Sequence, residues 1–214
     1  MLKLSLIHIL VAFNGSHKVQ GNTYDSINAV AEELRKENIQ VEIINVGSKS
    51  IRGCACCGGC SKNKDHRCVI NDEVNEWALK MKEADGIILG SPVYYAGLNG
   101  NMKSFLDRAF MISGANGGFL RHKVGASVAV ARRAGSVGTV DEMNKFISFT
   151  EMIMPTSNYW PVVYLSLIHI LNNKKIVVYI SQSESVFDIV DSVIRINDVS
   201  VLEEKNRIEN KCKA

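Results

Sequence analysis

The sequence LSLIHILVAFNGSHKVQGNTYDSINAVAEELRK, residues 4–36, contains the pattern that decides the fold. Residues 4–13 are apolar and rich in branched side chains, as in a strand that is covered on both faces of a sheet. A polar loop with two glycines follows at residues 14–23. Apolar residues then recur at helical spacing through residues 24–36, with Asn22 or Thr23 as the expected N-cap. The stretch predicts a strand, a loop and a helix in succession.

The loop before this helix has the chemistry of an anion site. Backbone N–H groups and the positive end of the helix dipole attract an anion, and Ser16, Asn22 and Thr23 can add side-chain hydrogen bonds. The loop has neither the G-x-G-x-x-G of dinucleotide folds nor the Gly-Lys-Ser/Thr ending of an ATP-binding loop. These features favour a phosphate site, and an ordinary capped turn is the alternative.

The same alternation of strand, loop and helix continues along the chain. The predicted strands are residues 40–46, 84–90 and 123–131, and the predicted helices are residues 71–82 with Asp72 as cap, 99–111 and 140–150. Such alternation implies right-handed crossovers and a parallel sheet. We therefore predict a doubly wound open α/β sheet with helices on both faces. Its ligand loops, including the cysteine-rich loop at residues 51–68, are expected at the carboxyl edge.

Two further loops are expected on this edge, and the first of them is suited to a planar ligand. Residues 91–97 read Ser-Pro-Val-Tyr-Tyr-Ala-Gly, in which Pro92 stiffens the turn, the tyrosines offer flat faces and Gly97 allows close backbone approach. A second polar, glycine-containing loop follows the last predicted strand at residues 132–139. The first loop predicts a site for a heterocycle, and a surface turn whose tyrosines pack on neighbouring helices is the alternative.

Five of the six cysteines lie together in residues 54–68. Cys54, Cys57, Cys60 and Cys68 have the spacing C-x2-C-x2-C-x7-C, and Cys56 is an additional thiol within it. Three cysteines at successive x2 spacing with a fourth downstream favour an iron–sulfur cluster. Structural zinc, a disulfide framework and free or redox-active thiols remain alternatives, although zinc half-sites normally stand further apart and disulfide-rich proteins are usually shorter.

Length and composition limit the function classes. The 214 residues are 46% hydrophobic, which suits one α/β domain with a substantial core. The 25 basic and 22 acidic residues are spread along the chain, so we predict no nucleic-acid partner. The apolar run at residues 4–13 is too short to span a bilayer and no cleavage site follows it, so we predict no membrane segment or signal peptide. The many thiols favour a reducing cytoplasm.

One heptapeptide, LSLIHIL, occurs identically at residues 4–10 and 165–171, with unrelated flanking sequence. A structural repeat would carry similar flanks. We therefore interpret the second copy as a sequence artefact, place the predicted domain at residues 1–164 and treat residues 165–214 as a tail of doubtful origin without an assigned function. His8 and His169 fall within the two copies and are interpreted as strand residues rather than metal ligands.

Several motifs between residues 3 and 164 resemble one family. They are Asn14-Gly15-Ser16, Gly21-Asn22-Thr23, the C-x2-C-x2-C-x7-C loop, the segment from Ala84 to Tyr94, and Lys103-x-Phe105-x-Asp107-Arg108. In this order and spacing the chain resembles the flavodoxin-like NAD(P)H-dependent FMN reductases, and within them the iron–sulfur flavoproteins. The family normally continues after Tyr164 with a glycine and a final helix, which the second heptapeptide replaces here.

The resemblance implies a set of site residues. The FMN phosphate would be held by Ser16, His17, Lys18, Asn22 and Thr23. The isoalloxazine would be lined by Ser91, Pro92, Val93, Tyr94, Tyr95 and Ala96 and by the loop containing Arg133, Gly135 and Gly138. Cys54, Cys57, Cys60 and Cys68 would bind a [4Fe–4S] cluster. No catalytic side chain is implied, because the flavin carries the hydride.

The expected function is an FMN-dependent oxidoreductase. By resemblance, NADH or NADPH would reduce FMN, and electrons would pass, with or without a [4Fe–4S] cluster, to a flavin, a quinone or a redox partner. A homodimer or higher homo-oligomer is also implied by the resemblance. The alternatives are a non-enzymatic flavodoxin-like electron carrier and a flavin-free domain with a structural zinc loop.

Overall fold

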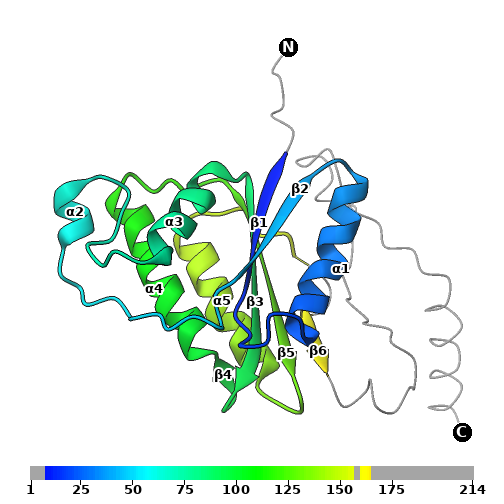
Figure 1. Ribbon diagram of the computed structural model, residues 1–214. Helices are drawn as coiled ribbons and strands as arrows, with labels where there is room; N and C mark the ends of the chain where they lie inside the picture. The colour runs from blue at the N-terminus through cyan, green and yellow to red at the C-terminus, as the bar shows by residue number, and fades with distance from the viewer. Residues whose placement is uncertain (1–7, 157–159, 165–214) are drawn as a thin grey trace, which may run out of the picture. The chain divides into compact units, whose positions relative to one another are not determined.

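A computed structural model describes residues 8–156 and 160–164 (Figure 1). Its strands are β1 (Ile9–Asn14), β2 (Gln40–Asn45), β3 (Gly86–Tyr94), β4 (Gly97–Leu98), β5 (Val124–Ala131) and β6 (Val162–Tyr164). Its helices are α1 (Asn22–Lys36), α2 (Gly59–Asn63), α3 (Glu73–Glu83), α4 (Gly100–Ala115) and α5 (Ser136–Phe149). The predictions for residues 165–214, including the domain boundary after Tyr164, lie outside the described residues.

The sheet has the strand order β2-β1-β3-β5-β6, and these strands are all parallel. Counting only these strands, the order is 2-1-3-4-5, the doubly wound arrangement of flavodoxins, in which the direction of winding reverses between the first and third strands. The predicted α/β class and sheet are therefore confirmed. The strand predicted from residue 4 begins at Ile9 in the described part of the chain.

Strand β3 is longer than predicted, because Ser91, Pro92 and Tyr94 belong to it rather than to a loop. The carbonyl of Gly90 accepts a hydrogen bond from Gly15 N, so this edge of β3 faces β1. Pro92 lies two residues further on, beyond the last strand residue of β1, and its missing N–H removes no ladder bond there. The strand then turns back into the short hairpin strand β4.

Helices cover both faces of the sheet, with α3, α4 and α5 on one face and α1 on the other (Figure 1). The core under α4 contains Phe13 and Phe105, whose ring centroids are 4.6 Å apart, and Trp77, which meets Phe105 edge-on at 5.6 Å. Phe13 and Phe105 are fully buried, and each such side chain contributes about 1.5–3 kcal/mol relative to an exposed one. This core fixes α4 against the strands that carry the ligand loops.

Helix α1 approaches the sheet closely through Ile27, Ala31 and Leu34, which are buried as predicted, whereas Val30 is only partly buried. A Cβ at Gly90 would lie 2.4 Å from Ile27 Cδ1, so the absence of a side chain at Gly90 permits this approach. Over the described residues we find no helix that is both long and apolar enough to cross a membrane.

Candidate functional site

The loop after β1 is braced by the buried side chain of Asn14. Its Oδ1 accepts a hydrogen bond from Ser16 N at 3.0 Å, and its Nδ2 donates to the carbonyls of Lys18 and Val19 at 3.4 and 3.3 Å. Asn45 Nδ2, at the end of β2, donates to Ser16 O at 3.0 Å. The loop is thus held from inside and from the neighbouring strand.

The start of α1 has a different cap from the one predicted. The N-cap is Gly21 in an extended conformation, and among the described residues no side chain caps the first turn. The prediction of Asn22 or Thr23 as N-cap is therefore wrong, because both residues already lie within the helix. An uncapped first turn leaves backbone N–H groups available to an anion.

The five predicted phosphate residues lie in or next to this loop. Ser16 and Thr23 are buried, with Ser16 Oγ accepting a hydrogen bond from Lys18 N at 3.2 Å. His17, Lys18 and Asn22 are exposed. Their role in binding phosphate remains a prediction.

The carboxyl end of β3 forms the second side of the site. Ser91 is fully buried; its hydroxyl donates to Pro92 O at 2.8 Å and accepts from Asn99 N at 3.2 Å. Asn99 caps α4 by accepting hydrogen bonds from Asn101 N and Met102 N. Asn101 Nδ2 in turn donates to Gly47 O at 2.9 Å, which ties α4 to the segment after β2.

The hairpin between β3 and β4 turns at Tyr95 and Ala96, which have φ angles of 47° and 62°. Two successive positive φ values define a type I′ turn, the usual two-residue connection in hairpins. Tyr94 is half exposed and Tyr95 is fully exposed. The structure therefore places the Tyr95 side chain in solvent at the tip of the hairpin, whereas Ser91, Pro92 and Val93 lie at its base.

The loop before α5 meets this hairpin. Gly135 is the N-cap of α5 with a φ of 90°, and a Cβ there would lie 2.5 Å from Ala96 Cα. Ser136 Oγ and Tyr164 Oη are 2.7 Å apart, which links α5 to β6. The loops that follow β1, β3 and β5 therefore adjoin at the carboxyl edge, as predicted.

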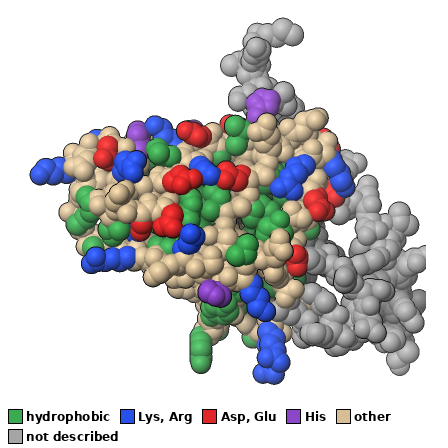
Figure 2. All heavy atoms as spheres, viewed as in Figure 1, with side chains coloured by type: hydrophobic (Ala, Val, Ile, Leu, Met, Phe, Trp, Pro, Cys, Tyr) green, Lys and Arg blue, Asp and Glu red, His purple; other side chains and the backbone are tan. Residues whose placement is uncertain are grey.

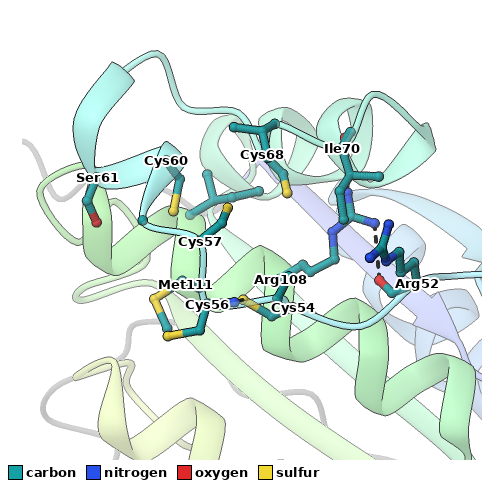
Figure 3. A pocket seen from close by; sticks show the side chains of 14 residues that line it. Arg52, Cys54, Cys56, Cys57, Cys60, Ser61, Cys68, Ile70, Arg108 and Met111 are labelled. Carbon is teal, nitrogen blue, oxygen red and sulfur yellow. Dashed lines mark hydrogen bonds between the residues drawn. The ribbon is translucent and has the colours of Figure 1, made fainter.

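The cysteines are not at this edge, so the prediction of a shared edge is wrong for their loop. They surround a cavity of about 300 Å³ beside the second half of α4, next to Arg108, Met111 and Ile112 (Figure 3). Arg108 follows Asn99 by nine residues, or about 14 Å along a helix. Helix α3 is only about 16 Å long at 1.5 Å per residue, so it does not reach the carboxyl edge. The connection from β2 to α3 therefore passes along the outer side of α4 (Figure 1).

The cysteine loop contains five free thiols. Cys54, Cys56 and Cys57 are exposed, and Cys60 and Cys68 are partly buried. Buried Asn75 fixes the last of them, because its Oδ1 accepts from Cys68 N at 2.7 Å and its Nδ2 donates to the carbonyls of Cys68 and Ile70. Within residues 8–156 and 160–164, no three His, Cys, Asp or Glu side chains are grouped around a single ion position.

Arg108 is the largest fully buried side chain beside these thiols. Its Nη1 and Nη2 donate to the two carboxylate oxygens of Asp72 at 2.5 and 2.7 Å. Burial disfavours the charge of this guanidinium, but its interactions with Asp72 and the Cys68 thiol outweigh burial and raise the pKa of Arg108. Asp72 also caps α3, as predicted, by accepting a hydrogen bond from Val74 N.

Sequence reasoning missed several residues that organise these sites. Asn45, Asn75 and Asn99 satisfy backbone groups of the loops. Asn14 and Arg108 were noted only as members of motifs, without the bracing role of Asn14 or the burial of Arg108. A signal for Arg108 does exist, because it stands three residues after Phe105 and four before Ile112 on the buried stripe.

The fold is that of a flavodoxin-like protein, with the loops after β1 and β3 meeting at the β1/β3 switch point. A profile of the NADPH-dependent FMN reductase family matches residues 9–164. The chain therefore belongs to the NADPH-dependent FMN reductase family, whose members are flavin-based oxidoreductases that bind FMN.

Individual relatives agree with this assignment. An iron–sulfur flavoprotein of Methanocaldococcus jannaschii is 37% identical over 161 residues, which cover 70% of this chain and 79% of the relative. A second iron–sulfur flavoprotein of that organism is 32% identical over 142 residues, covering 65% of this chain and 71% of the relative. The solved structure of RosB with a bound intermediate has a similar fold, with a TM-score of 0.55 at 14% identity over 73% of this chain and 64% of that one.

Proposed function

We propose that the protein is an FMN-dependent oxidoreductase that accepts hydride from NADH or NADPH and passes electrons to a flavin, a quinone or a redox partner. The meeting of the loops after β1, β3 and β5 at the β1/β3 switch point is the observation that carries this proposal. Family membership supports the flavin, and the hydride donor and electron acceptor are our inference.

The residues of the site divide between the two ends of FMN. The first-turn N–H groups of α1 and the side chains of Ser16, His17, Lys18, Asn22 and Thr23 would hold the phosphate. The isoalloxazine would be lined by Ser91, Pro92, Val93, Tyr94 and Ala96, together with Arg133, Gly135 and Gly138. The exposed side chain of Tyr95 would lie at the rim of this site. The contact between Gly135 and Ala96 provides the bare backbone surface that a flat ring needs.

When bound, FMN supplies the hydride acceptor. The chain contributes fixed dipoles and fixed positions. Asn14 holds the phosphate loop, and Ser91 and Asn99 hold the end of β3. The αL conformations of Tyr95 and Ala96 set the direction of the hairpin. None of these groups needs to exchange a proton during turnover. The carrier alternative lacks turnover with NAD(P)H, which makes it distinguishable by kinetics.

The cysteine loop fits a [4Fe–4S] cluster bound by Cys54, Cys57, Cys60 and Cys68. The two Methanocaldococcus jannaschii relatives reported above are iron–sulfur flavoproteins by name. The thiols line a cavity, and beside them a buried N–H of Arg108 has no hydrogen-bond partner in the part of the chain that the structure describes.

We extend the proposal to a cytoplasmic homodimer or higher homo-oligomer. The exposed free thiols suit a reducing compartment. Within one chain the cysteines lie beside the second half of α4, whereas the flavin loops lie at its start. A second subunit would offer an additional path between a cluster and a flavin.

The first test is the content of FMN, iron, sulfide and zinc per chain after purification without oxygen. One FMN with about four irons is the expected result. The same sample should then oxidise NADH or NADPH in the steady state with free flavin, quinone or ferricyanide as acceptor. Bound FMN without turnover would favour the electron carrier, and zinc without flavin would contradict the proposal.

A further inference from the structure

Arg108 joins the two ends of the cysteine loop. Its Nη2 donates to Ile70 O at 3.1 Å, two residues after Cys68, and its Nη1 contacts Arg52 O at 3.4 Å, two residues before Cys54. Both terminal nitrogens of Arg108 also donate hydrogen bonds to the carboxylate of Asp72. A single buried side chain on α4 thus fixes where the loop begins and where it ends (Figure 3).

One donor of this guanidinium is unsatisfied. Arg108 Nε is buried, and its N–H finds no hydrogen-bond acceptor among the described residues. The side chain lines the cavity that the cysteines surround (Figure 3). A buried N–H without an acceptor is unusual, and the acceptors that this cavity would hold are thiolate and sulfide sulfur.

We propose that Arg108 donates its Nε–H to a sulfur atom of the cluster and so tunes the cluster's reduction potential. The inference rests on the proposed [4Fe–4S] cluster. A guanidinium beside the sulfurs favours the reduced cluster, because the added electron makes the cluster more negative. Asp72 opposes this effect with its own charge.

Charge removal on either side of this ion pair gives opposite expectations. Arg108→Gln leaves the Asp72 carboxylate near the cluster and should make the potential more negative. Asp72→Asn frees the positive charge and should make the potential more positive, while asparagine still caps α3. Arg108→Lys keeps the charge but has no Nε–H, so it should fall between wild type and Arg108→Gln.

The experiment is a potentiometric titration of the purified protein, followed by the visible and EPR signals of the cluster. We expect about a tenfold change in the ratio of reduced to oxidised cluster at a fixed potential for the Gln and Asn variants, or about 59 mV for one electron. Arg35→Gln is the matched control, because Arg35 lies on α1 at the opposite face of the sheet.

If Arg108 only held the loop in place, Arg108→Gln and Asp72→Asn would both lose iron, and their reduction potentials would not shift in opposite directions. Equal potentials in Asp72→Asn, Arg108→Lys and Arg35→Gln would overturn the proposal, even if Arg108→Gln lost its cluster. Iron and sulfide analysis of the wild type tests the underlying cluster assignment separately. Absence of both from the wild-type protein would overturn the cluster and this inference together.

Discussion

Gly135 at the start of α5 packs directly against Ala96 at the tip of the β3–β4 hairpin, and a Cβ on Gly135 would lie 2.5 Å from Ala96 Cα. Gly135 also has a φ of 90°. A side chain here is therefore opposed both by the neighbouring backbone and by the local conformation. The contact joins two of the three loops proposed to hold FMN.

Gly135→Ala should separate these loops and weaken FMN binding. The left-handed conformation alone costs an alanine about 1–2 kcal/mol, and the clash adds to it. We expect at least a tenfold loss of FMN affinity, measured by fluorescence titration of the flavin-depleted protein. Gly114→Ala is the control, because that glycine lies inside α4 with nothing near a new Cβ, and it should leave FMN affinity unchanged. Equal affinities in the two variants would contradict the role of the contact.

Asn14→Ala should disorganise the phosphate loop. The substitution removes the acceptor for Ser16 N and the donor to Lys18 O and Val19 O from a buried position. An unsatisfied buried group costs about 1–3 kcal/mol. We expect weaker binding of both FMN and inorganic phosphate by calorimetry. Riboflavin lacks the phosphate, so its affinity should change much less, and an equal loss for riboflavin and FMN would argue against a phosphate loop.

Gly90→Ala should force α1 away from the sheet. The new methyl group would meet Ile27 Cδ1 at 2.4 Å, and overpacking of this kind costs about 1–3 kcal/mol. Ile27→Val removes the Cδ1 atom, so the double variant should recover part of the loss. The free energies of unfolding from urea titration of the four proteins form a double-mutant cycle. Additive effects would show that the two residues do not oppose each other.

Local pattern and periodicity sufficed for much of the fold. The run from residue 9 to Lys36 shows its strand, loop and helix directly, and Ile27, Ala31 and Leu34 are buried as their spacing predicts. The helix cap at Gly21 was missed because Asn22 and Thr23 are better capping residues by type, yet both are already helical. Here the geometry of the loop, and not side-chain preference, sets the helix start.

The placement of the cysteines could not be predicted from their spacing. It depends on the length of α3 and on the path of the chain around α4, which are properties of the packed domain. The partners Arg108 and Asp72 are 36 residues apart, so local pattern contains no sign of their pairing. The five clustered thiols could be recognised from the sequence. The position of Arg108 beside them could be recognised only once the fold was known.

Lys123, immediately before β5, provides a pH-dependent test of the packing at the opposite edge of the sheet. Its ammonium donates to the carbonyls of Lys82 and Ala84 at the end of α3. Burial lowers the pKa of Lys123 below its usual 10.5, with a smaller opposing effect of Asp85. Between the lowered pKa and 10.5 the unfolded chain binds more protons than the folded one, so the contribution of Lys123 to stability rises with pH.

The difference in unfolding free energy between wild type and Lys123→Met should therefore grow in favour of wild type as the pH approaches 10.5 from below. Urea titrations followed by tryptophan fluorescence from about pH 8 to about 11 measure this difference. Lys80 is a contrasting control, because its hydrogen bond with Glu42 raises its pKa above 10.5 despite the opposing effect of burial. Its stabilising contribution should be lost as the pH rises through that higher value. A difference for Lys123→Met that stays constant across the range would show that the ammonium is as well solvated in the folded protein as in the unfolded chain.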